Sequence, residues 1–189
     1  MSGAEIARTV TPPPTPWIMR GRLWASLQRH EGDTPPLPFG LHPHFTGHRV
    51  VALVRYLEGT LRYDELILGR VARRGFTVGL FVDHIWVDSR ESVAGGRVFW
   101  GLPKELAEFQ WTGDCVSVRD AEGEIATLSA NQEAARTPEI TVSTLVSDEG
   151  LIRDLHAYPN PTTGNLIIRS DVGMQGTNWQ LLDPLRVRW

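Results

Sequence analysis

The sequence predicts a mainly antiparallel β protein with few helices, built either as two packed sheets or as a closed barrel. From residue 48 onward the chain consists of short β-favouring runs, each bounded by Gly, Pro, Asn or Asp, as strands and hairpins are. Helical periodicity, in contrast, is scarce. Within residues 78–86, Val78, Leu80, Val82, His84 and Trp86 alternate with other residues, so one mostly apolar face is expected on that strand.

Two proline clusters divide the first 47 residues. The stretch "TPPPTP" at 11–16 cannot continue a helix or a central strand, so residues 1–15 are expected to form a flexible arm. The run at 17–30 could form a strand or a helix and is interpreted as a strand, and "DTPPLPFG" at 33–40 is interpreted as a loop. Residues 16–189 are expected to form a single domain, because their number suits one hydrophobic core.

The remaining elements follow in chain order. Seven runs are predicted as strands, at residues 48–57, 76–88, 114–120, 123–130, 139–146, 164–172 and 179–189. Short helices are predicted near 62–68, near 103–109 and near 148–155. Pro103 suits the first turn of a helix, where a missing N–H costs nothing. Lys104 would then lie in that first turn, where the helix dipole disfavours a charged ammonium.

Composition and charge argue against several classes of function. A net charge of −3 and a pI near 6.1 leave no basic surplus to neutralise phosphates, so nucleic acid is not expected as a partner. Cys115 is the only cysteine, which rules out an internal disulfide and fits a cytoplasmic location. No secretion signal is recognised, and Asp83 and His84 interrupt the most apolar window, so no membrane span is expected.

Lys104 is the only lysine among the nineteen Lys and Arg residues. A bias toward arginine codons could leave one lysine on the surface by chance. The chemical interpretation is that burial lowers the pKa of a lysine until part of it is free amine at neutral pH, whereas an arginine stays protonated. A free amine can attack a ketone or aldehyde and form a Schiff base. The residues alone leave both interpretations open.

Other motifs give weaker signals. The segment "HPHFTGH" places His42, His44 and His48 close together, but it is a Pro/Gly loop that no Cys or acidic ligand joins. Solvated histidines are therefore expected, and no metal site is predicted. The sequence also has neither a Walker-type loop nor Gly-x-Gly-x-x-Gly, and no cofactor is expected.

Three segments carry a resemblance to a known family. The stretches "IWVDSRESVAGGRVFWGLPKELAEF" at 85–109, "RYDELILG" at 62–69 and "PWIMRG" at 16–21 resemble the acetoacetate decarboxylase family. The resemblance implies that the Schiff-base lysine of the family falls on Lys104 and a family acid on Glu65. It also implies a double-layered, closed β-barrel-like cone with an internal cavity, assembled as a homo-oligomer.

The chain departs from the family pattern beside the lysine. Glu105 stands where the decarboxylase has a second lysine, and "VVALV" at 50–54 has no residue matching a second family acid. Variants of this kind resemble family members that catalyse aldol addition and dehydration, often in secondary metabolism. Simple decarboxylation of a β-keto acid and other Schiff-base reactions are therefore both expected as candidates.

The remaining site residues are assigned around a small keto acid. Arg29, which falls within one position of the family's active-site arginine, or Arg20 is expected to pair with a substrate carboxylate. Trp100 and Trp86 are expected to line the cavity, although core packing is the commoner role of such residues. The alternative function is a barrel that binds an apolar metabolite without covalent chemistry, or a cyclase-type barrel, in which Lys104 is not a nucleophile.

Overall fold

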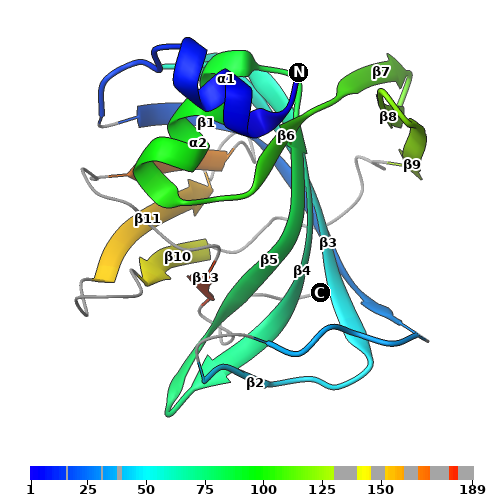
Figure 1. The fold of residues 1–189 in the computed structure, drawn as a ribbon, viewed down its shortest axis with the longest axis vertical. Helices are drawn as coiled ribbons and strands as arrows, with labels where there is room; N and C mark the ends of the chain where they lie inside the picture. The colour runs from blue at the N-terminus through cyan, green and yellow to red at the C-terminus, as the bar shows by residue number, and fades with distance from the viewer. Residues whose placement is uncertain are drawn as a thin grey trace.

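The computed structural model describes residues 1–15, 17–30, 32–37 and 40–129, together with the backbone of four later strands. Within these ranges only the backbone is described at residues 18, 20, 23, 26, 27, 74, 77 and 78. The described residues form two helices and thirteen strands (Figure 1). This confirms the prediction of a mainly β fold with few helices.

The strands form one ten-stranded and one three-stranded sheet. The order of the large sheet is β2-β4-β3-β1-β12-β11-β10-β13-β5-β6, and β4 also pairs with β5. Among the described pairings all are antiparallel except that of β5 with β6. The bounds of these strands are β1 (Trp17–Arg29), β2 (His42–Pro43), β3 (His48–Gly59), β4 (Tyr63–Arg74), β5 (Thr77–Val87), β6 (Lys104–Leu106), β10 (Ile140–Leu145), β11 (Ile152–Pro159), β12 (Leu166–Ser170) and β13 (Trp179–Leu182). The small sheet consists of β7 (Glu108–Thr112), β8 (Cys115–Asp120) and β9 (Gly123–Ser129).

The two faces of the large sheet support different layers. On one face, a core cluster that includes Trp17, Tyr63 and Val87 packs against the buried side of the helices. On the other face, Leu53 and Leu66 pack against apolar residues of the three-stranded sheet. Figure 1 shows the helices and the three-stranded sheet at the same end of the long strands β3, β4 and β5.

A β-bulge in β5 decides which residues face which layer. Leu68 pairs with His84 and Gly69 with Val82, so Asp83 has no opposite residue and the alternation shifts by one. Leu80 and Val82 therefore share the main core with Ile85 and Val87, whereas Trp86 belongs to the opposite cluster. The predicted single face containing both Val82 and Trp86 is wrong for this reason.

Helix α1 (Gly3–Thr9) occupies the place where a flexible arm was expected. Ser2 and Glu5 form a capping box, in which each side chain accepts a hydrogen bond from the backbone of the other residue. Ile6 is fully buried in the main core. The prolines at 12–14 lie after this helix, so they limit its C-terminal extent but do not prevent it. The prediction was wrong because it extended the effect of these prolines to the residues before them.

Helix α2 (Arg90–Trp100) was missed in the sequence, and the three predicted helices are wrong in the described residues. Ser89 caps the start of α2, and Gly101 ends it with a φ of 62°. Residues 63–68 belong to β4, 104–106 and 108–109 belong to β6 and β7, and 152–155 belong to β11. Residues 148–151 lie outside the described part. Tertiary packing on two faces of β4 overrides its weak helical pattern.

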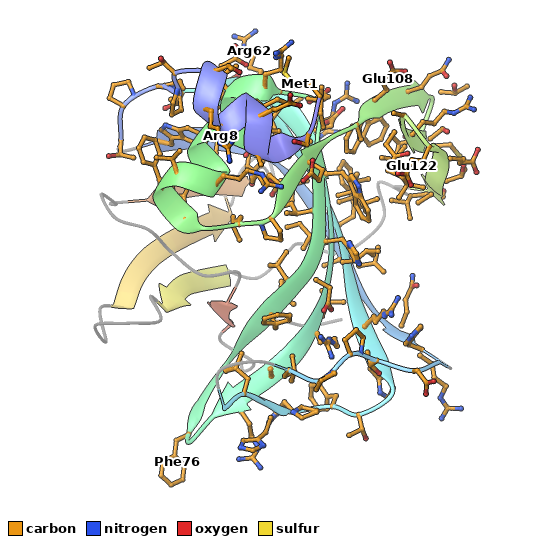
Figure 2. All side chains as sticks on the ribbon, in the orientation of Figure 1. Met1, Arg8, Arg62, Phe76, Glu108 and Glu122 are labelled. Atoms are coloured by element: carbon orange, nitrogen blue, oxygen red, sulfur yellow. The ribbon has the colours of Figure 1, made fainter. Side chains whose placement is uncertain are left out.

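The long hairpin of β4 and β5 ends at a turn around Gly75, which has a φ of 60°. At its tip the side chain of Phe76 points into solvent, far from the helices (Figure 2). The predicted strands at 48–57, 76–88, 114–120 and 123–130 coincide with β3, β5, β8 and β9. Those at 17–30, 139–146, 164–172 and 179–189 contain β1, β10, β12 and β13.

Candidate active site

Lys104 begins the short strand β6, directly after the loop that follows α2. Its backbone pairs with Ile85 in parallel, and its N–H donates to the carbonyl of Leu102 at 2.8 Å. Leu102 in turn donates to the carbonyl of Gly96 in α2 at 3.0 Å. Lys104 is therefore held on a strand between β5 and α2, and the expectation that it lies in the first turn of a helix is wrong.

The ammonium group of Lys104 is buried and has three acceptors. Lys104 is 4% exposed, and its Nζ donates to Glu65 Oε2 at 2.5 Å, to Ser92 Oγ at 3.0 Å and to Tyr63 OH at 3.3 Å. An ammonium carries three protons, so each proton has a partner. The surface interpretation of this lysine is thereby excluded.

Glu65 comes from β4 and is as buried as the lysine, at 4% exposure. Its Oε1 accepts from Tyr56 OH and its Oε2 from Tyr63 OH, each at 3.4 Å. Tyr63 and Glu65 are two residues apart on one strand, so they share a face. Tyr56 is the cross-strand partner of Tyr63, and their rings are 4.5 Å apart. Antiparallel pairing of β3 with β4 thus builds the wall around the carboxylate.

The electrostatics of the pair differ from the sequence-based expectation. Burial lowers the pKa of Lys104, but the carboxylate of Glu65 and the hydroxyl of Tyr63 raise it by more, so the pKa lies above its ordinary value. Burial and the charge of Glu65 also raise the pKa of Tyr63 to about 12 and place that of Tyr56 well above its ordinary value. These raised pKa values keep Lys104 protonated and both tyrosines neutral at neutral pH.

Glu105 makes its contacts away from the ammonium of Lys104. Its carboxylate forms an ion pair with Arg97 of α2 and accepts from the backbone N–H of Gly3 at 2.6 Å. Arg97 Nε also donates to the carbonyl of Lys104 at 2.7 Å. Glu105 therefore ties α1, α2 and β6 together, and these elements lie side by side in Figure 1.

The structure does not bring Arg29, one of the two predicted substrate arginines, to Lys104. Arg29 is exposed and pairs with His48, which is eight residues along β3 from Tyr56. At ~3.3 Å per residue this is a distance of about 26 Å, which excludes direct contact with the Lys104 site. The backbone of Arg20 pairs with Glu58 and Ile167, and its side chain lies outside the described part.

The two predicted cavity tryptophans have different surroundings. Trp100 is buried in the same apolar cluster as Tyr63, with its ring 4.8 Å from that of Trp17. Trp86 lies on the opposite face of the sheet and stacks on His84 at 5.4 Å. The structure therefore does not bring Trp86 to Lys104, because Lys104 pairs with Ile85 and the next residue of a strand points to the opposite face.

Sequence reasoning missed three members of the site: Tyr63, Tyr56 and Ser92. Tyr63 carried a usable signal, because its spacing of two from Glu65 on a strand predicts a shared face. Ser92 carried no usable signal, because it lies on α2 and that helix was not predicted from the sequence. Across the described residues, no group of three or more His, Cys, Asp or Glu side chains could hold a metal ion, and His42 and His44 are exposed. The described helices are also too short or too polar to cross a membrane.

Comparison with known proteins bears on the identity of this site. A sequence model described as acetoacetate decarboxylase matches residues 35–179 of the chain, which confirms the resemblance. The fold is similar to that of an acetoacetate decarboxylase from Legionella pneumophila subsp. pneumophila str. Philadelphia 1, with a TM-score of 0.58, 14% identity, and coverage of 89% of this chain and 88% of that chain. A second solved acetoacetate decarboxylase has a TM-score of 0.56 and 12% identity, covering 93% of this chain and 99% of that chain. A comparison with curated protein sequences finds no match.

Proposed function

We propose that this chain, which belongs to the acetoacetate decarboxylase family, is a lyase that forms a Schiff base between Lys104 and a small keto acid. The observation that supports this most directly is the buried contact of 2.5 Å between Lys104 Nζ and Glu65 Oε2. It joins a potential nucleophile to a group that can take its proton. Activation by desolvation of such a lysine is described for acetoacetate decarboxylase in general, and the raised pKa of Lys104 means that a proton acceptor is needed as well.

The first step is proton transfer from Lys104 Nζ to Glu65 Oε2. Burial favours this step, because the transfer converts two buried charges into a neutral amine and a neutral acid. The amine then attacks the carbonyl carbon of the substrate, and the proton on nitrogen moves to the new oxygen. Glu65 returns its proton as that oxygen leaves as water, which produces an iminium ion beside an ionised carboxylate.

The iminium ion then accepts an electron pair. In a β-keto acid the bond to the carboxylate breaks, CO2 leaves, and its bonding electrons form an enamine. A proton from solvent adds to the enamine carbon, and water hydrolyses the resulting iminium to release the ketone and the amine. With a substrate that instead loses an α-proton, the enamine can attack an aldehyde, which gives aldol addition and then dehydration.

Because the chain departs from the family pattern beside Lys104, aldol addition with dehydration is as well supported as decarboxylation. Glu105 forms an ion pair with Arg97 and so cannot supply the cationic neighbour of the decarboxylase pattern. We therefore include both decarboxylation and aldol-type chemistry of secondary metabolism. The assay that separates them measures CO2 release from acetoacetate in one reaction and condensation of pyruvate with an aldehyde in another.

The proposal includes the architecture around the site. Strand β4 lies near one end of the strand order of the large sheet and β5 near the other, so the pairing of β4 with β5 supports a closed sheet. We therefore propose a closed double-layered cone formed by residues 16–189 as a single domain. It also includes a cavity beside Lys104 and assembly as a homo-oligomer. Light scattering in solution tests the assembly, and a mass equal to that of one chain would contradict it.

A non-covalent binding function is the second candidate. The raised pKa of Lys104 and the three acceptors around its ammonium favour it, because both keep the amine protonated. In that case the buried pair only stabilises the fold around an apolar metabolite.

Borohydride trapping distinguishes the two functions. The protein is incubated with acetoacetate or pyruvate and borohydride, and intact mass and peptide mapping then locate any adduct. Because Lys104 is the only lysine, the N-terminal amine is the only other primary amine. We expect an adduct at Lys104 that is absent in Lys104→Ala and Lys104→Arg. Tight binding of an apolar ligand with no adduct from any keto acid would overturn the lyase proposal.

A further inference from the structure

The stem of Lys104 crosses helix α2 directly over Gly96. A Cβ added to Gly96 would lie 2.4 Å from Cδ, 2.8 Å from Cε and 3.0 Å from Cγ of Lys104. Side chains do not approach so closely, so the lysine occupies the space that any other residue at position 96 would fill. Gly96 is itself buried.

The helix itself does not require glycine at this position. Gly96 lies inside α2, and it is not among the glycines with a positive φ. Glycine is the poorest helix former after proline, so alanine here would favour the helix. Because the atoms nearest to a Cβ at this position all belong to Lys104, the lysine stem is the reason that we infer for the glycine.

We propose that Gly96 is a positioning residue, which provides the slot that holds the Lys104 stem and aims its amine at Glu65. The catalytic part of this inference rests on the proposed function, whereas the steric part does not. The stem is flexible and α2 is not, so a methyl group at position 96 would displace the lysine rather than the helix. The Lys104 amine, which lies 2.5 Å from Glu65 Oε2 and 3.0 Å from Ser92 Oγ, would then lose these contacts.

The neighbouring glycine of α2 provides a matched control. A Cβ on Gly95 would lie 2.3 Å from Trp17 and 3.2 Å from Pro12, whereas the atoms nearest to a Cβ on Gly96 all belong to Lys104. Gly95→Ala should therefore perturb the packing of α2 on the core without a direct effect on the lysine. A comparison of the two alanine variants separates damage to the helix from displacement of the amine.

A thermal-unfolding cycle tests the steric part without any substrate. Gly96→Ala is measured in the wild type, in Lys104→Met, which keeps heavy atoms at the γ, δ and ε positions, and in Lys104→Ala, which removes them. We expect Gly96→Ala to lower the unfolding midpoint in the first two backgrounds. In Lys104→Ala it should leave the midpoint unchanged or raise it, because the clash is gone and the helix propensity remains. An equal loss in all three backgrounds, or a Gly96→Ala/Lys104→Ala double variant that does not fold, would overturn the inference.

Borohydride trapping tests the positioning part. We expect Gly96→Ala to reduce the rate of adduct formation at Lys104 by on the order of a hundredfold, as a shift of ~1 Å in a reacting group can do. It should also change the pH dependence of trapping, because the amine leaves Glu65, whereas Gly95→Ala should retain the wild-type pH dependence. Wild-type rate and pH dependence in a folded Gly96→Ala would contradict the positioning role. Absence of trapping in the wild type would instead contradict the proposed function, and the unfolding cycle would still decide on the slot.

Discussion

Glu65 Oε2 lies 2.5 Å from Lys104 Nζ, although 39 residues separate the two in the chain. Strand β4 supplies the carboxylate and β6 the amine, and β5 lies between them in the sheet, pairing with both. Antiparallel pairing on one side and parallel pairing on the other place the two side chains on the same buried face. The chemistry proposed for this protein depends on that contact.

Glu65→Gln tests the contact directly. The amide keeps the shape of the side chain but cannot accept the lysine proton or oppose the effect of burial with a negative charge. We expect the pKa of Lys104 to fall below its wild-type value, which moves the pH dependence of borohydride trapping toward lower pH. Turnover should fall by about 10²–10⁴-fold, as expected for loss of a general acid–base group. Trapping with an unchanged pH dependence would show that Glu65 does not control the amine.

Ser92→Ala removes the buried hydroxyl group that accepts one hydrogen bond from the ammonium of Lys104. Because Ser92 is fully buried and contacts a charged group, the variant should lose about 1.5–3 kcal/mol of unfolding free energy. Urea unfolding at neutral pH measures this loss. Ser89→Ala is the control, since Ser89 caps the same helix by accepting from the backbone of Ser92 at 3.1 Å. The control should cost ~1 kcal/mol while trapping at Lys104 keeps the wild-type rate. Equal effects of both variants on trapping would contradict a specific role for Ser92.

Glu105→Lys restores the residue of the decarboxylase pattern, and we expect no gain of activity. The substitution would remove the ion pair between Glu105 and Arg97 and the hydrogen bond that Glu105 accepts from Gly3. Because the side chain of Glu105 is 44% exposed, the loss of the ion pair should cost no more than about 1 kcal/mol.

Thermal unfolding and trapping are both measured, with Glu105→Gln as the control that removes the charge alone. Mass mapping is needed here because Glu105→Lys adds a second lysine. A large increase in the trapping rate at Lys104 at neutral pH would show that position 105 controls its amine after all.

Alkaline pH should destabilise the protein through the buried site. Burial raises the pKa of Tyr63 from 10.0 to about 12, and Glu65 holds that of Lys104 above its ordinary value. Between these two pKa values the folded state binds more protons than the unfolded state. The contribution of Tyr63 to the free energy of unfolding is therefore fully present below pH 10 and declines as the pH rises toward 12. For Tyr63 alone, two pKa units correspond to roughly 2–3 kcal/mol.

Urea midpoints measured from pH 8 to 12 check this prediction. Tyr63→Phe, which cannot ionise, should show a shallower decline than the wild type over the alkaline range. Parallel curves for the two proteins would indicate that Tyr63 titrates alike in the folded and unfolded states.

Much of the site was accessible from sequence because it depends on residue types. A single lysine after Pro103 and the resemblance of its segment to a Schiff-base family pointed to Lys104, and the resemblance of "RYDELILG" to the same family pointed to Glu65. The alternation of apolar residues and the frequency of turn residues predicted a β fold. These are local properties, in which each residue carries its own chemistry and its own preference for strands or turns.

Contacts between distant segments decided the rest. Whether Trp86 shares a face with Val82 depends on the bulge at Asp83, and the approach of Ser92 to Lys104 depends on a helix that sequence reasoning overlooked. Burial alone would lower the pKa of Lys104, and only the folded arrangement brings in Glu65 and Tyr63 to raise it. A pKa reports the balance between desolvation and neighbouring charges. That balance depends on distances of a few ångströms across strands, which the order of residues does not specify.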